Sequence, residues 1–273
     1  MTRTEAGSRT APLSRGAAVV TGASSGIGLE IARLLAADGY DLLLVASGER
    51  KLLEVAARFS DEYGRVANAF AVDLARSDGA GSLLREIERR GLVVDVLVNN
   101  AGFGVYGLFA AADPARTLEM IQVNVTSLTE LTRGVLPRMT ARRSGRILNV
   151  ASTAAFQPGP LMAVYYATKA YVLSFSEALA NELAGSGVTV TALCPGSTRT
   201  AFQERAGLKR TPLAAGPLVG DARRVAQAGH RGMLRGRRVV VPGLANRVMM
   251  HAVRITPRRL VTAIARRIQE SKI

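Results

Sequence analysis

One stretch decides the fold of this 273-residue chain: Thr21-Gly22-Ala23-Ser24-Ser25-Gly26-Ile27-Gly28. The apolar run at 17–21 before it predicts a strand, and the helical periodicity of 27–37 predicts a helix directly after it. Glycine is needed where a backbone turns sharply or approaches a pyrophosphate, and a helix N-terminus offers free N–H groups to phosphates. The lysine of a Walker loop is missing, which excludes that type of nucleotide hydrolase. The stretch therefore predicts a dinucleotide-binding strand–loop–helix unit.

Short apolar runs alternate along the chain with segments of helical periodicity. Runs such as Leu42-Leu43-Leu44-Val45 suit strands that are covered on both faces, and their alternation with helices predicts a parallel sheet. The expected strands are 17–21, 41–45, 66–72, 94–99, 146–150, 189–194 and 238–242. The expected helices are 27–37, 50–63, 81–90, 114–142, 165–182 and 221–234. We predict an α/β fold, a three-layer doubly wound parallel sheet of about seven strands.

We expect one domain at 16–243 with an extension at each end. Residues 1–15 are polar and aperiodic, which predicts a disordered N-terminal extension. Within the domain, 201–220 has no clear period and contains two prolines. A connection of that length is typical of a lid over a site, and a surface loop is the alternative. Residues 244–273 predict a basic amphipathic helical extension.

The composition limits the compartment and the kinds of site. Hydrophobic residues make up 48% of the chain, enough for a substantial core, and no apolar stretch approaches the roughly 18 residues of a membrane span. Cys194 is the single cysteine, so internal disulfides are excluded, and His230 and His251 lack the spacing of metal ligands. We therefore expect a cytoplasmic protein without a metal site.

The net charge of +15 is concentrated in the C-terminal part. Residues 201–273 hold 16 Lys and Arg against 3 Asp and Glu, while the rest of the chain is nearly neutral. This pattern argues against a nucleic-acid-binding protein and indicates a local basic surface. A helix at 258–270 would place on one side Leu260, Val261, Ile264 and Ile268. With arginines around the other side, it would dock on its own domain, pair with another subunit or lie on an anionic membrane.

Three polar residues combine in a way that predicts acid–base chemistry. Ser152 follows the expected strand 146–150, at the sheet edge where open α/β folds bind ligands. Tyr165 and Lys169 open a helix four residues apart and so share one face, whereas Tyr166 has no lysine at that spacing. A phenol with a pKa of about 10 is a poor catalyst near neutrality, and a nearby ammonium lowers that pKa. The pair therefore predicts a proton donor and acceptor.

The end of the second strand bears on the choice of cofactor. NAD-dependent enzymes place Asp or Glu there to bind the ribose hydroxyls, and this chain has Ala46 followed by Ser47. A carboxylate would repel a 2′-phosphate, so the neutral end favours NADP over NAD, with Ser47 and Arg50 or Lys51 near the phosphate. Asp73, after the third strand, is placed to meet the adenine, and a helix cap is the alternative.

Several motifs agree in order and spacing, and through them the chain resembles the short-chain dehydrogenase/reductase family over roughly 16–243. The matching segments are Thr21–Gly28, Asn99-Asn100-Ala101-Gly102, Gln122-Val123-Asn124, Ser152, Tyr165, Lys169 and Pro195-Gly196-Ser197-Thr198-Arg199-Thr200. The resemblance implies a cofactor site that includes Thr21, Gly22, Ser24, Ser25, Gly26, Ile27, Gly28, Ser47, Asp73, Leu74, Asn100, Ala101, Gly102, Tyr165, Lys169, Pro195, Gly196, Thr198 and Thr200. One departure is Ser47, where many NADP-using relatives carry Arg.

The resemblance also implies the chemistry, hydride transfer between a nicotinamide and a carbonyl or secondary alcohol by an NAD(P)-dependent oxidoreductase. Tyr165 would exchange a proton with the substrate oxygen, and Ser152 would hydrogen-bond that oxygen. Lys169 would lower the pKa of Tyr165 and hold the nicotinamide ribose. Asn124 would keep a water in a proton relay. Pairing through the long helices would give a homodimer or homotetramer.

Apolar residues near the expected site indicate an apolar ketone or a 3-oxoacyl compound as the substrate. The candidates for the pocket wall are Phe103, Val105, Phe156, Met162 and Phe202, and ordinary core packing is the alternative for each. Two other functions fit parts of the pattern. One is a non-catalytic dinucleotide-binding regulator, which would be expected to lose Tyr165 or Lys169. The other is a membrane-surface-associated, lipid-type dehydrogenase that uses the basic tail.

Overall fold

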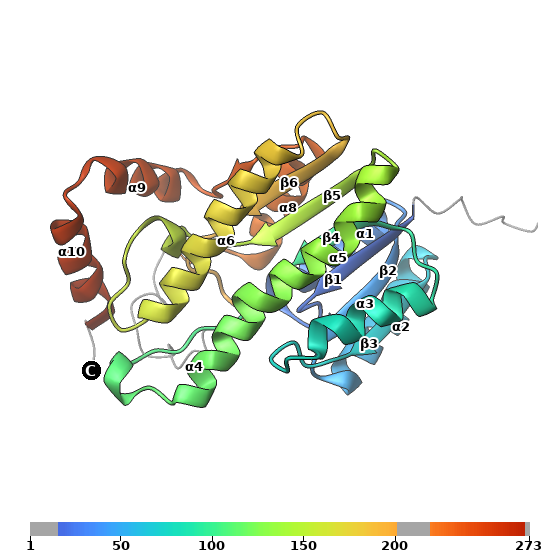
Figure 1. The fold of residues 1–273 in the computed structure, drawn as a ribbon, viewed down its shortest axis with the longest axis horizontal. Helices are drawn as coiled ribbons and strands as arrows, with labels where there is room; N and C mark the ends of the chain where they lie inside the picture. The colour runs from blue at the N-terminus through green and yellow to red at the C-terminus, as the bar shows by residue number, and fades with distance from the viewer. Residues whose placement is uncertain (1–15, 201–218, 271–273) are drawn as a thin grey trace, which may run out of the picture.

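The computed structural model describes residues 16–200 and 219–270. Figure 1 shows a twisted sheet with helices on both faces and two C-terminal helices grouped at one end of the molecule. The extension expected at 1–15 and nearly all of the lid expected at 201–220 lie outside the described residues.

Seven strands form one parallel sheet in the order β3-β2-β1-β4-β5-β6-β7. Their bounds are β1 (Ala17–Thr21), β2 (Asp41–Ala46), β3 (Ala67–Ala71), β4 (Val94–Asn99), β5 (Gly145–Val150), β6 (Val188–Leu193) and β7 (Val239–Val240). The chain winds outward from β1 in both directions, so the strand order reverses between β1 and β4. The predicted doubly wound α/β fold is confirmed, and β7 is shorter than the strand expected at 238–242.

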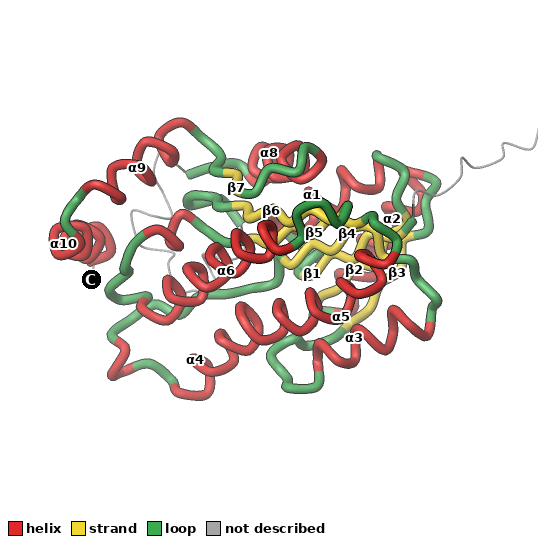
Figure 2. Tube along the Cα trace, turned by 45° about the horizontal axis from the view of Figure 1, so that its top comes forward, coloured by secondary structure: helices red, strands yellow, loops and turns green. Residues whose placement is uncertain are grey.

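Helices cover both faces of the sheet (Figure 2). On one face lie α1 (Gly26–Ala37), α2 (Glu49–Tyr63) and α8 (Ala222–Leu234), and on the other α3 (Gly79–Arg89), α5 (Leu128–Ala141) and α6 (Ala163–Glu182). Alternate strand residues point to opposite faces. Val19 and Leu43 therefore pack with α3, α5 and α6, and Val20 and Leu44 with α1, α2 and α8. Burial on both faces explains why these strands are continuous aliphatic runs.

The helix expected at 114–142 is interrupted. α4 (Pro114–Ile121) and α5 are joined by a π-helical segment, Gln122–Ser127. Asn124 within it is buried, and its side chain bonds to the backbone of Phe103 in the loop after β4. The π-helical turn thus places the Asn124 side chain against a loop that is distant in the sequence. Such turns within α-helices are often found near functional sites.

The basic segment at the C-terminus forms α9 (Leu244–Ile255) and α10 (Arg258–Glu270). α10 docks on its own domain, which is one of the three arrangements expected for it. Val261 is buried, and the Tyr106 hydroxyl donates to the carbonyl oxygen of Gln269 at 2.7 Å. Among the described residues, no helix combines the length and the apolarity that crossing a membrane requires.

Candidate active site

A cavity of about 670 Å³ opens at the carboxyl ends of the central strands. Gly22 after β1, Asn100 after β4, Ser152 after β5 and Pro195 after β6 all line it. This edge, where the strand order reverses, is the place where open α/β sheets bind ligands, and the volume is in the usual range for small molecules. In the described part of the chain, no group of His, Cys, Asp and Glu is arranged to hold a metal ion.

The loop after β1 is shaped for the close approach of a ligand. Gly22 and Gly26 have φ angles of +66° and +58°, which side chains rarely adopt. Both line the cavity with Ser24, Ser25 and Ile27. α1 begins at Gly26, and Ser25 at its N-cap makes no side-chain hydrogen bond to the first turn. Backbone N–H groups in this position suit the pyrophosphate of a dinucleotide.

Thr21 and Gly28, which are also expected to contact the cofactor, do not line the cavity, and that contact stays a prediction. The Thr21 hydroxyl donates to the Val98 carbonyl and accepts from the backbone N–H groups of Asn100 and Ala101, at 3.0 Å each. A Cβ on Gly28 would lie 2.3 Å from Asn100 Nδ2. Both residues pack against the β4 segment on the side of the loop away from the cavity. The sequence motif alone does not separate these residues from the ones that line the cavity.

The end of β2 forms the cavity's far end and carries no acidic side chain. Ala46 and Ser47 line it, together with Lys51 from α2. Arg50, also expected near the cofactor, is not among the lining residues, and its guanidinium lies 3.8 Å from Glu54 on the exposed side of α2. A neutral wall with one ammonium suits a phosphorylated ribose better than an unmodified one.

Asp73 and Leu74, after β3, line the same region of the cavity. Asp73 Oδ1 accepts from the backbone N–H of Ala75 at 2.9 Å, which turns the chain after the strand. Asp78, not Asp73, occupies the N-cap position of α3. Asp73 is thus a turn residue that lines the cavity, and its contact with an adenine stays a prediction.

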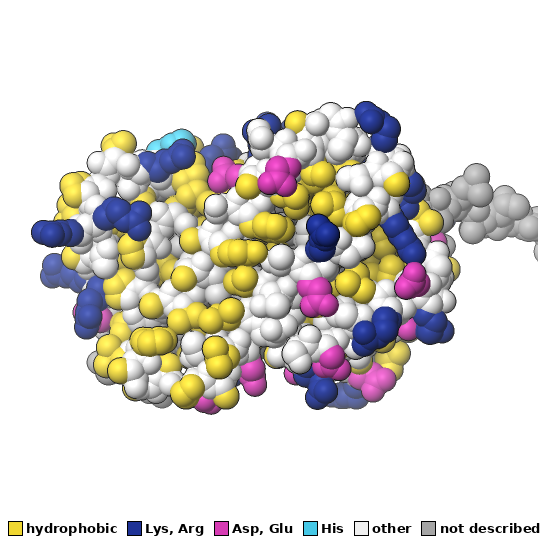
Figure 3. Space-filling model, viewed as in Figure 1, with side chains coloured by type: hydrophobic (Ala, Val, Ile, Leu, Met, Phe, Trp, Pro, Cys, Tyr) yellow, Lys and Arg dark blue, Asp and Glu magenta, His cyan; other side chains and the backbone are white. Residues whose placement is uncertain are grey.

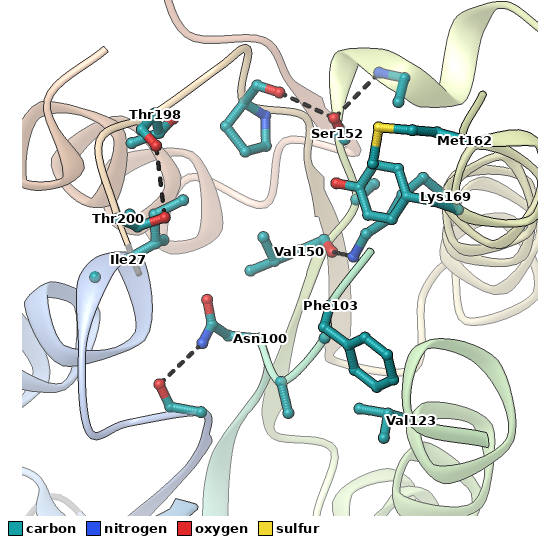
Figure 4. Close-up of a pocket in the computed structure, with 18 of the residues that line it drawn as sticks. Ile27, Asn100, Phe103, Val123, Val150, Ser152, Met162, Lys169, Thr198 and Thr200 are labelled. Atoms are coloured by element: carbon teal, nitrogen blue, oxygen red, sulfur yellow. Dashed lines mark hydrogen bonds between the residues drawn. The ribbon is translucent and has the colours of Figure 1, made fainter. Parts of the chain in front are cut away.

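Ser152, Tyr165 and Lys169 line the other end of the cavity. The Ser152 side chain hydrogen-bonds the Tyr165 side chain. Lys169 Nζ donates to the Val150 carbonyl at 2.8 Å (Figure 4), and it lies 5.8 Å from the centre of the Tyr165 ring. A hydroxyl, a phenol and an ammonium therefore lie close together in the cavity. Together these three groups can transfer a proton and stabilise an oxyanion.

Burial controls the protonation of this group. It raises the pKa of Tyr165 above the ordinary value, and the hydrogen bond with Ser152 lowers it in part. It also lowers the pKa of Lys169 to about 8. Lys169 Nζ is directed at the Val150 carbonyl, and its expected effect on the pKa of Tyr165 stays a prediction. Ser152 is the group that favours the phenolate here.

The lowered pKa of Lys169 makes its effect on stability depend on pH. The folded protein loses this proton at about pH 8, whereas the unfolded chain keeps it to about pH 10.5. Between these values the unfolded state binds more protons, so the free energy of unfolding rises with pH. We expect the stability of Lys169→Met relative to wild type to fall by roughly 2 kcal/mol between about pH 7.5 and about pH 9.5.

Urea unfolding of both proteins without cofactor measures this difference. Lys51→Met, at an exposed position, is the matched control and should show no such trend. A stability difference between Lys169→Met and wild type that is independent of pH would contradict the lowered pKa.

Asn124 does not line the cavity and positions its neighbours instead. Its Nδ2 donates to the Phe103 carbonyl at 2.9 Å and to Thr168 Oγ1 at 3.0 Å. Its Oδ1 accepts from the Phe103 N–H at 3.1 Å. A Cβ on Gly102 would lie 2.9 Å from Asn124 Oδ1 and 3.4 Å from Lys169 Nζ, so this glycine permits close packing beside the lysine. The water relay expected at Asn124 stays a prediction.

The loop after β6 forms another wall of the cavity, beside Ser152. The residues that line the cavity from it include Pro195, Gly196, Thr198 and Thr200. Thr198 Oγ1 donates to the Gly196 carbonyl at 2.9 Å, and the Ser152 hydroxyl donates to the Pro195 carbonyl at 3.4 Å. Figure 4 shows Thr198 and Thr200 on one side of the cavity and Lys169 on the other. The loop therefore lies across the cavity from Lys169, and its expected contact with a nicotinamide stays a prediction.

Apolar side chains surround the remaining part of the cavity, and they are only in part those expected. Phe103 and Met162 line it (Figure 4). Val105 lines a smaller neighbouring cavity, and Phe156 packs in a separate core cluster. Phe202 lies outside the described residues.

The C-terminal helices complete this wall. The lining residues that sequence reasoning missed include Val123, Gln157, Tyr166, Met249, Ala265, Ile268 and Gln269. The last four lie on α9 and α10. The apolar periodicity of 258–270 predicted a buried side for this helix, but it held no information about the surface that the helix covers.

The chain matches several known proteins. A family model described as short chain dehydrogenase matches residues 16–211. A putative ketoacyl reductase of the monensin polyketide synthase from Streptomyces virginiae is 40% identical over 190 residues, which cover 69% of this chain and 72% of that protein. The very-long-chain 3-oxoacyl-CoA reductase-A of Danio rerio is 38% identical over 186 residues, or 65% of this chain and 56% of that protein.

A solved structure extends the likeness from sequence to fold. A short-chain dehydrogenase from Sphingobium yanoikuyae, in complex with NADPH, is 34% identical with a TM-score of 0.79, over 88% of this chain and 93% of that one. The matches include the loop after β1 and the strand ends around the cavity. The chain therefore belongs to the short-chain dehydrogenase/reductase family and is an NAD(P)-dependent oxidoreductase.

Proposed function

We propose that the protein interconverts apolar ketones or 3-oxoacyl compounds and their secondary alcohols, with NADP(H) as the preferred cofactor. One observation carries the proposal. A single cavity joins Ser152, Tyr165 and Lys169 to a neutral end at Ala46 and an apolar wall at Phe103. A regulator that only bound a dinucleotide would need no buried phenol and ammonium with shifted pKa values, and such groups are typical of catalytic sites.

In the direction of reduction, Tyr165 gives its phenolic proton to the carbonyl oxygen of the substrate. A bound reduced nicotinamide supplies the hydride that the carbonyl carbon receives. Ser152 donates to the same oxygen as negative charge develops on it. Its present bond to the Pro195 carbonyl is long, at 3.4 Å, and so it is readily exchanged for a bond to substrate. Lys169, with a pKa of about 8, binds the nicotinamide ribose.

The preference for NADP rests on the end of β2. Ala46 offers no carboxylate to hold both ribose hydroxyls, while the Ser47 hydroxyl and the Lys51 ammonium are donors for a 2′-phosphate. The relative from Sphingobium yanoikuyae was solved with NADPH, which supports the same choice.

The substrate class rests on the side chains around the catalytic residues. Phe103, Met162 and Ile268 supply apolar surface. Arg116 also lines the cavity, but its guanidinium stacks 3.9 Å from the centre of the Phe103 ring and pairs with Glu119 at 2.7 Å. The names of two relatives, a putative ketoacyl reductase and a 3-oxoacyl-CoA reductase, support 3-oxoacyl compounds as one such class.

A substrate panel tests this proposal. Purified protein would be offered bulky aryl ketones, steroid-like ketones and 3-oxoacyl thioesters with NADPH or NADH, and the absorbance of the reduced nicotinamide would be followed. We expect consumption of NADPH with at least one of these classes. Tight binding of NADPH without turnover of any would favour the regulator instead.

We further propose that the protein is a cytoplasmic homodimer or homotetramer. Members of the family generally form oligomers. Tyr171 on α6 is 38% exposed, and its hydroxyl lies 2.8 Å from Thr129 Oγ1 on α5. These two long helices therefore form one continuous outer face on which a second copy could pack. The single cysteine, Cys194, is buried, which fits a reducing compartment.

The outer side of α9 and α10 supports a second function, attachment to a membrane surface. The exposed aliphatic residues there that do not line the cavity are Leu244, Val248, Ile255, Leu260 and Ile264. The arginines of the same two helices are Arg247, Arg254, Arg258, Arg259, Arg266 and Arg267. We call these eleven residues the tail surface, and Figure 3 shows basic and hydrophobic side chains gathered at this end. Aliphatic residues surrounded by cations suit the headgroup boundary of an anionic membrane.

We expect the full chain to bind phosphatidylserine-containing vesicles at low salt and to leave them at high salt, since each arginine contributes about 1 kcal/mol and salt screens it. Ile255→Glu with Leu260→Glu should abolish co-sedimentation, because it places two carboxylates on the tail surface. Leu53→Glu, at an exposed position on α2, is the matched control. Equal binding to neutral vesicles, or none at low salt, would contradict the proposal. A loss of oligomer mass in the double variant would assign the tail surface to subunit pairing.

A further inference from the structure

A second cavity, of about 200 Å³, lies beside the catalytic cavity. Two segments form most of it, the loop after β4 and the loop that leads into α6. The backbone N–H of Gly107 donates to the Leu161 carbonyl at 2.8 Å, which joins these loops. Leu161 is buried and has a φ of +65°, a conformation that residues with a side chain rarely adopt. Backbone strain of this kind persists where the surrounding structure enforces it, and it is found often at ligand sites.

The lining of the second cavity is almost entirely apolar. Its two polar side chains are bonded within their own segments, Thr117 to the Asp113 carbonyl and Arg266 to Glu270. An apolar cavity of about 150 Å³ holds a molecule the size of benzene. The second cavity therefore suits a phenyl ring or a short hydrocarbon chain, and not a charged group. The larger apolar residues that line it include Val105, Leu108, Phe109, Met120, Leu161 and Val164.

Met162 separates the second cavity from the catalytic cavity. Among the described residues it is the only one that lines both. It is 4% exposed and packs in the same core cluster as Tyr165, three residues later in the chain. Figure 4 shows Met162 on the side of the catalytic cavity where Ser152 and Lys169 lie. A methionine side chain is unbranched and adapts its shape readily. The wall between the two cavities is therefore one flexible residue.

We propose that the second cavity binds the far end of the substrate's hydrocarbon chain and that Met162 determines specificity by turning aside to admit it. The inference rests on the proposed function, and it narrows the substrate class to ketones or 3-oxoacyl compounds whose apolar chain is long enough to pass Met162. Because Met162 packs with Tyr165, a carbonyl held at the phenol lies near this wall. Leu108 and Phe109 are 59% and 68% exposed, so a still longer chain can extend toward solvent.

A series of linear ketones tests the inference, from methyl ethyl ketone to methyl heptyl ketone, with NADPH as the cofactor. The chain-length ratio is the kcat/KM for the longest ketone divided by that for the shortest. For wild type we expect kcat/KM to rise by about fourfold for each methylene that enters the second cavity.

Ala112→Phe places an aromatic ring in the second cavity, because Ala112 lines that cavity and not the catalytic one. It should lower the chain-length ratio by at least about tenfold, since two or more methylenes lose their place. Ala110→Phe is the matched control. Ala110 lies in the same segment, is exposed and lines neither cavity, so this variant should keep the wild-type ratio.

Substitutions of Met162 test its role as the wall. Met162→Ala removes the side chain that has to turn aside, and the chain-length ratio should rise by about threefold or more. Met162→Phe puts a larger and less flexible side chain there, and the ratio should fall by a similar factor. Ratios within one variant are compared because Met162 also lines the catalytic cavity, and a general loss of activity affects the long and the short ketone alike.

A chain-length ratio in Ala112→Phe equal to that of wild type overturns the inference, and a change of oligomer mass in that variant would then assign the second cavity to an interface between copies. Ratios that do not move in opposite directions in the two Met162 variants overturn its role as the wall. If wild type reduces ketones without regard to chain length, or reduces aryl ketones and no linear one, the inference fails and the proposed function stands. Failure of wild type to reduce any ketone or 3-oxoacyl thioester overturns both.

Discussion

A Tyr165→Phe enzyme is expected to turn over a verified ketone about 10²–10⁴ times more slowly than wild type, with little change in NADPH affinity. The substitution removes one hydroxyl and keeps the ring, which is 9% exposed and packed in the core. In the variant, Ser152 can still stabilise charge on the substrate oxygen, but no phenol remains to give that oxygen a proton. Lys169 keeps its bond to the Val150 carbonyl, so the ribose contact should persist.

Stopped-flow or steady-state consumption of NADPH gives kcat, and fluorescence titration gives cofactor affinity. Tyr171→Phe is a matched control, because Tyr171 is on the same helix and outside the cavity, and its turnover should equal that of wild type. Turnover by Tyr165→Phe close to that of wild type would remove Tyr165 from the chemistry.

Ala46→Asp should move the ratio of catalytic efficiencies, NADPH over NADH, toward NADH by about 100-fold. The new carboxylate would stand at the end of β2 beside Ser47 and Lys51, where the account places the 2′-phosphate. It would repel that phosphate and would accept hydrogen bonds from the two ribose hydroxyls of NAD. Both effects shift the ratio in the same direction, which makes this the largest change expected in cofactor choice.

Ala46→Asn separates charge from size at the same position, since the amide is nearly isosteric with the carboxylate and neutral. It should shift the ratio by far less than Ala46→Asp. Equal shifts for both variants would show that shape and not charge sets the preference. A wild-type enzyme at least about tenfold better with NADH would contradict the assignment of this end of the cavity to a phosphate.

The fold was predictable from the sequence wherever a short run of aliphatic residues indicates a buried element. Leu42 to Val45 are buried almost completely because helices cover both faces of β2, and an uninterrupted aliphatic run records that fact directly. The break in the helix around Asn124 was not predictable in this way. It coincides with hydrogen bonds between Asn124 and Phe103, 21 positions earlier, and no periodicity contains a contact across that separation.

The site was predictable where its residues sit in short motifs and not where distant segments meet. Gly22, Ser152 and Tyr165 could be named from sequence because each follows a strand or opens a helix at the same sheet edge. Gln269 could not, because its place in the cavity depends on how α10 docks. Burial decided the electrostatics as well. Burial lowers the pKa of Lys169, and the ammonium donates to the Val150 carbonyl, a contact that the sequence pattern does not contain.

Transfer of deuterium from NADPH labelled at the reactive carbon of the nicotinamide would show directly that the protein moves a hydride to its substrate. Samples labelled on either face of the ring would be incubated with wild type and an accepted ketone, and the alcohol would be analysed by mass spectrometry. We expect an alcohol heavier by one mass unit with one labelled face and not with the other, and about 10²–10⁴ times less product in the same time with Tyr165→Phe. An alcohol that carries no deuterium from either face, or equal product from Tyr165→Phe, would contradict this mechanism.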